Sequence, residues 1–557
     1  MSQSVTIEQA LNLGRQHQQA GQFQKAEQIY LQILQQVPNQ PDALHLLGVV
    51  AQQVGRIDMA IELISRAIAG NPKAANYYSN LAEAYRSIGR LDEAEAACRR
   101  ALELNPTLAV AHGNLGAVLL DKKQLDDAEQ SLRRALKIEP SLFGALSGLC
   151  GVLLSKGQVD EAIEAGRRAI SITPNYAIAH NNLANALLKK GLLVDAEAAS
   201  RRAVELAPNN PQMLANLANI IRLSGNLEQA IKIWERAISI DPSSDRTKWD
   251  LALGYLTLGD FSRGFQLYES RFTREEGRPY WREYLVPRWD GFDLNGKTIL
   301  VYPEQGYGDV IMFARFIPAL AEMGARVLIH VPDDLVDLMK RVDGVDQVFG
   351  SQAELPPFDT YLPLMSVPRV LGTSVRTIPS KVPYIQVDSS RCAKWADRII
   401  AEQGQLKVGI IWAGRPTHPD DVRRSLPLSA FEPILRLPNI KFFSLQKGDA
   451  AGQLTHLPSD IHVTDLQSQI QDFADTAAAI ANLDLLISVD TAPVHVAGAI
   501  GAKVWTLIAS TPDFRWMLNR EDSPWYPTMR LFRQNIGEDW SEAIARIANE
   551  LHRMTDD

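Results

Sequence analysis

The stretch "ANYYSNLAEAYRSIGRLDEAEAACRRALELNPTL", residues 75–108, decides the fold of the amino-terminal half of this 557-residue chain. It contains Gly89, then Ala94 five residues later, then Pro106 after a further twelve. The proline recurs every 34 residues, at positions 38, 72, 106, 140, 174, 208 and 242. A constant period of 34 is typical of helix-turn-helix repeats, so the period predicts an array of paired helices.

The alanine and the glycine of this unit recur in the same register. The alanines, whose small side chains let two helices approach closely, are Ala26, Ala60, Ala94, Ala128, Ala162, Ala196 and Ala230. The turn glycines are Gly21, Gly55, Gly89, Gly157, Gly191 and Gly225, and Lys123 takes the place of one. The pattern resembles the tetratricopeptide repeat family over residues 7 to about 242.

A degenerate eighth unit follows and ends near Phe272. It keeps the turn glycine, Gly259, but has Gly264 and Arg271 where small alanines are usual. We expect it to cap the array and to act as the hinge to the next domain. We assign the array to residues 1–275.

One position of the first helix carries asparagine in several units. These asparagines are Asn12, Asn80, Asn114, Asn182 and Asn216, and Leu46 and Gly148 interrupt the row. An amide donates and accepts, so stacked asparagines can pair with the peptide groups of an extended chain. The row resembles the asparagine ladder of protein O-linked N-acetylglucosamine transferases, which implies a groove that binds a protein or peptide partner. The alternative is that these asparagines only cap or solvate helices.

Composition narrows the class of protein. Hydrophobic residues make up 46% and charged residues 22% of the chain, which is ordinary for a soluble protein of two or more domains. The formal net charge of −8 argues against a nucleic-acid binder. Cys98, Cys150 and Cys392 are far apart and have no metal-ligand spacing. No basic leader and no long uncharged apolar run occurs, so we expect a cytoplasmic protein without a membrane span, with peripheral membrane contact left open.

The second half of the chain alternates short strands with helices. Residues 276–296 lose the helical period and form the predicted linker. We expect one α/β lobe over 297–390, beginning with a strand, a turn with Gly306 and Gly308, and a helix from Ile311 to Glu322. A second lobe is expected over 391–557. The alternation predicts two doubly wound parallel sheets, with a ligand in the cleft at the carboxyl ends of their strands, so the fold class is α + α/β.

The stretch "LLISVDTAPVHVAGAIG", residues 485–501, places polar residues at one such strand end. Asp490, Thr491 and His495 follow the strand, where the N–H groups and dipole of the next helix favour an anion such as a diphosphate. The small Ala492 lets a phosphate approach the backbone. The alternative is that Asp490 and Thr491 only cap the helix.

Three motifs carry a second resemblance. "EQGYGDVIMFARFIPAL", "WAGRPTHPDDVRRSLPLSAF" and "DTAPVHVAGAIG" occur in this order, and together they resemble the heptosyltransferase-like glycosyltransferases, which have two Rossmann-like lobes of the GT-B type. The resemblance covers roughly 297 to 550. It implies an acceptor at the first lobe, a nucleotide sugar at the second and Asp309 as the catalytic base. It also implies that Arg424, in "RSLP", contacts the donor diphosphate.

Inverting transfer needs a base for the acceptor proton and groups that hold the departing diphosphate. The resemblance implies that Asp490, Thr491 and His495 line the nucleotide-sugar site, with Ala492 where the family has glycine and Arg424 where it has lysine. Both differences leave the sugar open. We expect the N–H groups of Thr491 and Ala492 to bind the diphosphate. The strand-end residues expected to shape the nucleotide pocket are Trp412, Gly414 and Gln446.

Each of these roles has a structural alternative. Asp309 can be a turn carboxylate that bonds the "GYG" backbone, and Arg424 can form a salt bridge with Asp420 or Asp421. His495 can be a packed helix residue. Lys447 can reach the diphosphate, but a lone strand-end lysine is more often solvated.

The sequence favours a metal-independent transferase, since it has no Asp-x-Asp motif to hold a divalent metal, and a nucleotide-diphosphate sugar is the only co-substrate predicted. An oxidoreductase is disfavoured because Ile311 stands where the third glycine of the dinucleotide fingerprint is needed. The second alternative is a non-catalytic scaffold with a degenerate transferase-like half, because a fold does not guarantee an activity.

Overall fold

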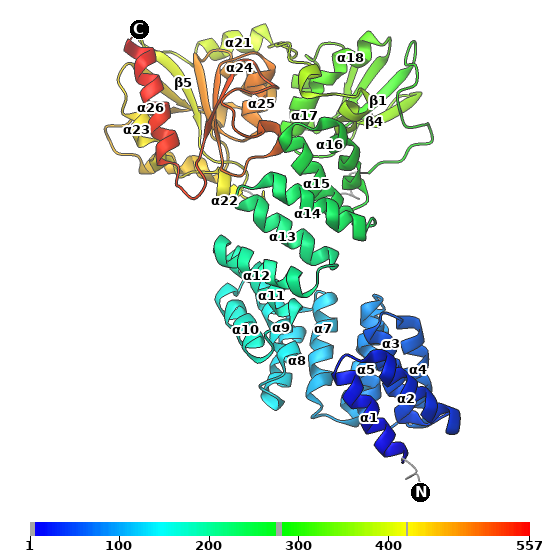
Figure 1. The fold of residues 1–557 in the computed structure, drawn as a ribbon. Helices are drawn as coiled ribbons and strands as arrows, with labels where there is room; N and C mark the ends of the chain where they lie inside the picture. The colour runs from blue at the N-terminus through cyan, green and yellow to red at the C-terminus, as the bar shows by residue number, and fades with distance from the viewer. Residues whose placement is uncertain (1–5, 275–280, 419–420, 557) are drawn as a thin grey trace. The chain divides into compact units, whose positions relative to one another are not determined.

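The computed structural model describes residues 6–274, 281–418 and 421–556. The chain forms two compact units, Met1–Ser224 and Gly225–Asp557. The first unit consists of helices that pack in successive pairs, drawn from blue through cyan to green in Figure 1. These are α1 (Ile7–Gln19), α2 (Phe23–Gln36), α3 (Pro41–Gln53), α4 (Ile57–Gly70), α5 (Ala75–Ser87), α6 (Leu91–Leu104), α7 (Ala109–Asp121), α8 (Leu125–Ile138), α9 (Phe143–Ser155), α10 (Val159–Ile172), α11 (Ala177–Lys189), α12 (Leu193–Leu206) and α13 (Pro211–Leu223).

The recurring alanines and glycines lie where the repeat pattern predicts them, between paired helices and in the turns. All seven recurring alanines are fully buried, at 0% exposure, where the two helices of a pair meet. The six turn glycines have φ between +72° and +90°, the left-handed region that only glycine enters without strain. Lys123 adopts the same conformation, with φ of +61°. The turn therefore keeps its geometry in the one unit that lacks glycine, at the cost of backbone strain.

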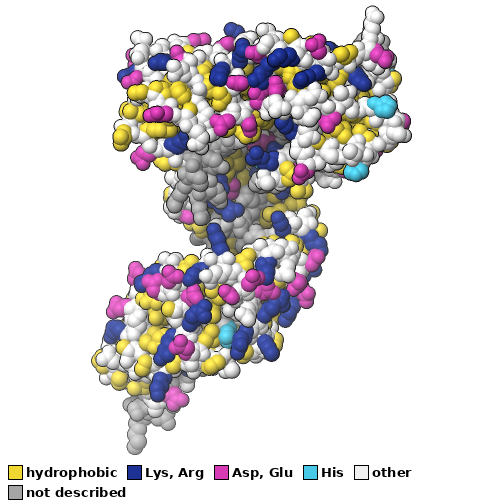
Figure 2. Space-filling model, turned by 180° about the vertical axis from the view of Figure 1, so that it is seen from behind, with side chains coloured by type: hydrophobic (Ala, Val, Ile, Leu, Met, Phe, Trp, Pro, Cys, Tyr) yellow, Lys and Arg dark blue, Asp and Glu magenta, His cyan; other side chains and the backbone are white. Residues whose placement is uncertain are grey.

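Ion pairs between consecutive repeats also follow the 34-residue period. Lys122 Nζ lies 2.8 Å from Asp92 Oδ1, and Lys156 Nζ lies 2.7 Å from Asp126 Oδ1. Lys190 pairs with Asp160 in the same way. On the face seen in Figure 2, basic and acidic side chains are interspersed over the surface.

The second unit begins with three more repeat helices, α14 (Leu227–Ile240), α15 (Asp245–Leu258) and α16 (Phe261–Tyr268), and the 3-10 turn η1 (Glu269–Phe272). Buried residues of α15 and α16, such as Leu256 and Phe265, belong to the same hydrophobic core as the α/β lobes. The ring of Phe261, for example, stacks on that of Trp525, with centroids 5.6 Å apart. The last repeat helices are therefore packed into the α/β region.

The first lobe has a four-stranded parallel sheet in the order β3-β2-β1-β4. Its strands are β1 (Thr298–Tyr302), β2 (Arg326–His330), β3 (Gln347–Phe349) and β4 (Thr360–Pro363). The predicted linker begins outside the described residues, and its described part packs Tyr284 and Val286 against Leu300 and Tyr302 of the sheet. The other helical segments of this lobe are η4 (Asp333–Leu335), α19 (Val336–Met339), η5 (Leu364–Ser366), α20 (Val367–Val370) and η6 (Val375–Thr377), and α21 (Ser389–Ala396) packs on α24 (Phe473–Ile480) of the second lobe.

The helix expected from Ile311 to Glu322 is wrong in its bounds. The structure has α17 (Tyr307–Phe313), the 3-10 turn η3 (Ala314–Phe316) and α18 (Ile317–Glu322). Pro318 stands in the first turn of α18, and because proline has no N–H it interrupts the hydrogen bonding of a continuous helix.

The second lobe has a six-stranded parallel sheet in the order β10-β9-β8-β5-β6-β7. Its strands are β5 (Leu406–Ile411), β6 (Ile440–Ser444), β7 (Val463–Asp465), β8 (Leu485–Val489), β9 (Val504–Ile508) and β10 (Met529–Arg533). Helices α24 (Phe473–Ile480) and α25 (Ala492–Ala499) cover one face, and α23 (Glu432–Leu435) and α26 (Ser541–Asp556) cover the other (Figure 1). The strand order reverses between β5 and β8, which confirms the doubly wound sheet and creates a switch point there.

None of the helices in the described residues is both long and apolar enough to cross a membrane.

Candidate functional site

A cavity of about 740 Å³ lies at the carboxyl ends of β5, β6 and β8. This is the switch point of the second sheet, where ligands of doubly wound proteins bind, and the volume is within the range of small-molecule sites. The first lobe contributes Tyr307 and Asp334 to its wall. The predicted residues that line it are Gly414, Gln446, Thr491 and Ala492.

The corner after β8 has the geometry of an anion site. Thr491 is the N-cap of α25, and its side chain makes no capping hydrogen bond. Pro493 has no N–H, and the N–H of Val494 donates to Thr491 O at 3.1 Å. Within the described chain, the N–H groups of Thr491 and Ala492 and the Thr491 hydroxyl therefore remain for a ligand in the cavity. Asp490 precedes this corner and is not among the lining residues.

Arg424 lies directly behind the wall formed by Gly414. A Cβ atom at Gly414 would lie 2.8 Å from Arg424 Nη2 and 2.6 Å from Asp421 Oδ1, so a larger residue there would displace these two side chains. Arg424 Nε lies 3.5 Å from Asp421 Oδ1, so the structure contains the salt bridge considered as the alternative for this arginine. Asp420, the other partner considered, lies outside the described residues. The guanidinium is 18% exposed, and the long ion pair leaves it donors for an anion.

Gln446 holds the ends of β5 and β6 together. Its Oε1 accepts hydrogen bonds from the N–H groups of Trp412 at 3.0 Å and Ala413 at 2.9 Å, and its Nε2 donates to Ala413 O at 3.1 Å. Trp412 itself is fully buried in the core on the far side of this loop. Gln446 thus shapes the cavity, whereas Trp412 supports it from behind.

His495 is packed away from the cavity. It is 4% exposed, its ring stacks on that of Trp516 with centroids 5.4 Å apart, and its Nδ1 lies 3.0 Å from the hydroxyl of Tyr526. Burial lowers its pKa to about 3, with Arg315 and Arg424 adding to the effect, so the imidazole is neutral at pH 7. His495 is therefore a packed helix residue in this structure. Its expected place in the nucleotide-sugar site stays a prediction.

The glycine-rich turn of the first lobe packs directly on this histidine. A Cβ atom at Gly308 would lie 2.8 Å from His495 Cδ2. Glycine at this position therefore lets α17 of the first lobe and α25 of the second approach closely.

Asp309 is the third residue of α17 and is 14% exposed. Its Oδ2 accepts from the N–H of Gly306 at 3.1 Å, which is the turn contact considered as its structural alternative. Its Oδ1 forms an ion pair with Arg515, in η10 (Phe514–Trp516) of the second lobe. Arg515 also lies 2.5 Å from Asp513 Oδ1. Both carboxylate oxygens of Asp309 thus have partners in the described chain, and its role as base stays a prediction.

Sequence reasoning missed the aromatic and charged residues that complete the wall. The Tyr307 hydroxyl donates to Asp334 Oδ2 at 2.8 Å, and its ring meets that of Phe473 at 5.1 Å in an edge-to-face contact. The hydrogen bond to Asp334, with burial, raises the pKa of Tyr307. Arg415 lines the same wall and is exposed. Its place directly after Gly414, four residues beyond the end of β5, was a usable signal.

Lys447, considered and set aside, also lines the cavity. Its Nζ donates to Ile470 O at 2.7 Å, so the lysine is anchored to the backbone at the cavity edge. The cavity is thus lined by two cations, Lys447 and Arg415, and by carboxylates that include Asp334 and Asp421. Among the described residues no cluster of three or more histidine, cysteine or carboxylate groups is arranged to hold a metal ion.

The predicted asparagine row lies along the first helices of the repeats. The Nδ2 of Asn114 donates to Ser79 O at 3.0 Å, and that of Asn182 donates to Ser147 O at 3.0 Å. Asn80 and Asn216 reach side chains of the preceding repeat, His45 and Asn181, and Asn12 is exposed. Four of the five amides are therefore half-buried and hydrogen-bond to the preceding repeat. The sequence pattern alone did not predict these bonds.

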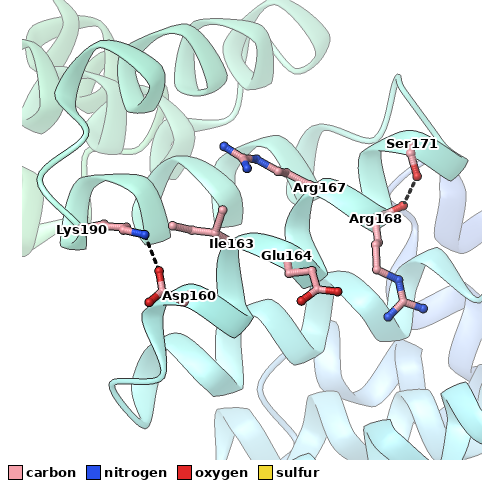
Figure 3. Close-up of a pocket in the computed structure, with 7 residues that line it drawn as sticks. All are labelled: Asp160, Ile163, Glu164, Arg167, Arg168, Ser171 and Lys190. Carbon is pink, nitrogen blue, oxygen red and sulfur yellow. Dashed lines mark hydrogen bonds and ion pairs between the residues drawn. The ribbon is translucent and has the colours of Figure 1, made fainter.

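The first unit has a second hollow, of about 430 Å³, on α10 and the end of α11 (Figure 3). It is lined by Arg167, Arg168 and Lys190 and by two carboxylates. In neighbouring repeats a glutamate four residues before the arginine pairs with it, as Glu129 does with Arg133 at 2.7 Å. Ile163 stands at that place before Arg167, which explains why the hollow is partly apolar.

Comparison with known families separates the same two parts. A model of the C-terminal domain of cilia and flagella-associated protein 70, a tetratricopeptide domain, matches residues 2–213, and a tetratricopeptide repeat model matches residues 211–244. A glycosyltransferase family 9 (heptosyltransferase) model matches residues 439–541. The chain joins tetratricopeptide repeats to a glycosyltransferase family 9 domain. The family 9 match includes the Thr491 corner, whereas Asp309 and Arg424 lie outside the matched residues.

Among curated proteins the chain is similar to Protein FlbA of Caulobacter vibrioides, with 27% identity over 321 residues. The match covers 53% of this chain and 53% of FlbA, so the chain spans about half the length of that relative.

Two solved structures are similar to the repeat part. TTC0263 of Thermus thermophilus, a thermophilic tetratricopeptide repeat protein, has 29% identity, covers 32% of this chain and 98% of its own, and has a TM-score of 0.30. YrrB, described as a tetratricopeptide repeat protein with an unusual peptide-binding site, has 25% identity, covers 33% and 95%, and has a TM-score of 0.25.

Proposed function

We propose that this chain is a glycosyltransferase that moves a sugar from a nucleoside diphosphate donor to a protein or glycan acceptor, and that the repeat array recruits this acceptor. The observation that carries the proposal is the cavity at the switch point of the second lobe, with the free N–H corner at Thr491 on one side and Arg424 behind Gly414 on the other. Together these groups suit a diphosphate.

The diphosphate would be held by groups that need no movement. The N–H groups of Thr491 and Ala492 point their dipoles at the anion, and the Arg424 guanidinium adds a full positive charge. As the bond between the sugar and the diphosphate breaks, negative charge grows on the departing oxygen, and these donors stabilise it. Lys447 and Arg415 at the edge of the cavity add to the same field. No step requires a metal, and we propose metal-independent transfer.

The aromatic edge-to-face pair of Tyr307 and Phe473 closes the wall between the two lobes. We propose that it excludes water from the donor, because water in the cavity would compete with the acceptor for the sugar. The nucleoside would occupy the part of the cavity next to Gln446, whose own hydrogen-bonding groups are already used by the backbone of Ala413 and its neighbours.

Asp309 is the proposed base. Direct displacement at the anomeric carbon by an acceptor hydroxyl inverts its configuration, and a carboxylate within reach of that hydroxyl takes its proton. The ion pair with Arg515 occupies Oδ1 of Asp309. Oδ2, bonded only to the N–H of Gly306 in the described chain, is the oxygen that we propose meets the acceptor.

The alternative candidate is a scaffold without turnover. It is favoured by one observation, the engagement of both oxygens of Asp309 by Arg515 and Gly306, which is what a purely structural carboxylate would show. The repeat array would then carry the whole function through protein binding, which its fold indicates.

A turnover assay distinguishes the proposed glycosyltransferase from the scaffold. The assay measures release of nucleoside diphosphate from a panel of nucleotide sugars by the full chain, with and without candidate acceptors. We expect Asp309→Asn to lower the rate by about 100-fold or more, as loss of a general base does. Asp343→Asn, at an exposed carboxylate of the same lobe, is the matched control and should retain the rate. Binding of a diphosphate without turnover in the wild type would favour the scaffold.

A further inference from the structure

The last turn of the repeat array contacts the residues that directly precede the glycine-rich turn. In six of the seven regular repeats a buried alanine occupies the register position of Arg271, and these alanines are Ala67, Ala101, Ala135, Ala169, Ala203 and Ala237. Arg271 breaks this pattern, although it is only 5% exposed. A guanidinium in the place of an alanine needs partners, because an unpaired buried charge is costly.

Two of the three partners of Arg271, Glu304 and Ser366, come from the first lobe, and the third, Glu269, lies in η1 itself. Its Nη2 lies 2.5 Å from Glu304 Oε1 and 2.7 Å from Ser366 Oγ, and its Nη1 lies 2.8 Å from Glu269 Oε1. Glu304 is 2% exposed, and its second oxygen accepts from the N–H of Met365 at 3.2 Å. Glu304 stands two residues before Gly306, so this ion pair holds the start of the turn that carries Asp309.

Tyr268 makes a second connection from the same turn of the array. Its hydroxyl accepts from Gln305 Nε2 at 3.0 Å, one residue before Gly306. Its ring also meets that of Phe514, with centroids 6.0 Å apart, and Phe514 precedes the Arg515 that pairs with Asp309. Tyr268 is 1% exposed, so these contacts are fixed by packing. One buried side chain therefore touches both segments that meet at the Asp309–Arg515 pair.

We propose that Tyr268 and Arg271 are positioning residues for Asp309, so that the end of the repeat array is part of the catalytic support. The proposal rests on the proposed function, since Asp309 must act as a base for its position to matter. The two side chains touch neither donor nor acceptor. They fix the backbone at Glu304 and Gln305, and this backbone sets the distance from Asp309 to Arg515 and to the acceptor hydroxyl.

The first test uses Tyr268→Phe in the full chain, which removes the hydroxyl and keeps the ring. The matched control is Tyr255→Phe, in the same repeat, where the hydroxyl bonds Glu235 and Arg263. We expect Tyr268→Phe to lower kcat at least fivefold with the donor KM within twofold of the wild type, because loss of one buried hydrogen bond is worth about that factor. An unchanged kcat, or an equal loss in Tyr255→Phe, would overturn the proposal.

The second test separates positioning from stability. Arg271→Met alone leaves Glu304 buried without its partner and will unfold part of the chain. The double variant R271M/E304M replaces the ion pair by apolar side chains, which is often neutral for stability. We expect its melting temperature to return towards that of the wild type while kcat stays low. Recovery of kcat together with the melting temperature would show that the pair serves only stability.

Hydrogen exchange keeps the proposal testable if no turnover is found with any donor. We expect the backbone amides of residues 304–312 to exchange at least fivefold faster in Tyr268→Phe than in the wild type or in Tyr255→Phe. Unchanged exchange would overturn the positioning role. Faster exchange in a chain that binds nucleoside diphosphate and does not turn it over would support the positioning and count against the proposed enzyme, so the two claims fail separately.

Discussion

His495 makes the second unit sensitive to acid. Burial lowers the pKa of its imidazole to about 3, against about 6.5 in an unfolded chain. Below pH 6.5 the unfolded chain takes up a proton that the folded chain does not, so stability is full above this pH and is lost as the pH falls towards 3. At pH 5, about 1.5 units below the unfolded value, the loss from this one group is about 2 kcal/mol.

The test compares the wild type with His495→Gln. Glutamine cannot take up a proton, so the variant is less stable at pH 7 because of lost packing on Trp516 but loses about 2 kcal/mol less between pH 7 and pH 5. Urea unfolding followed by tryptophan fluorescence at several pH values measures both slopes. An NMR titration of the imidazole carbon resonances gives the pKa directly. Equal losses in the two proteins, or a folded-state pKa near 6.5, would refute the buried neutral histidine.

Three further changes test the fold and the site. Gly414→Ala places a Cβ 2.6 Å from Asp421 Oδ1 and displaces the Arg424 pair, so calorimetry should show nucleoside diphosphate binding weakened about tenfold; unchanged affinity would exclude Arg424 from the site. Asn114→Ala removes the hydrogen bonds to Ser79 and should lower the free energy of unfolding by about 1–2 kcal/mol in urea, whereas the exposed Asn12→Ala should change it by less than about 0.5 kcal/mol. Lys123→Gly relieves a φ of +61° and should raise the free energy of unfolding by about 0.5–1 kcal/mol; a decrease would mean that the side-chain contacts of Lys123 outweigh its strain.

The parts of the fold that repeat or alternate could be predicted from the sequence. A period of 34 with a buried alanine in each unit fixes helix pairs, because each repeat contacts only its neighbours and the same residue types recur where they meet. Parallel strands read as short apolar runs, such as "LLISV", and the residues after them must lie at one edge of the sheet. Gly414, Gln446 and Thr491, which follow such strands, line one cavity.

Contacts between distant segments could not be predicted. Arg515 pairs with Asp309 across about two hundred residues, and no local pattern in "TPDFRW" marks it. The burial of His495 depends on Trp516 and on the close approach of Gly308, which are set by how the two lobes pack. Arg271 was visible as a departure from the repeat, but its partner Glu304 lies in another domain of the sequence. The break before Pro318, by contrast, could have been predicted, because a proline inside an expected helix is visible in the sequence.

The most direct test of the account is calorimetric titration of nucleoside diphosphates into the full chain and into its Thr491→Val variant. The Thr491 hydroxyl makes no capping bond, so valine should leave the melting temperature unchanged. We predict that at least one nucleoside diphosphate binds the wild type with a single site and that the variant binds it at least fivefold more weakly, as loss of one hydrogen bond to a charged group requires. Absence of binding for every nucleoside diphosphate, or equal affinity in the variant, would contradict the claim that this cavity holds the diphosphate of a sugar donor.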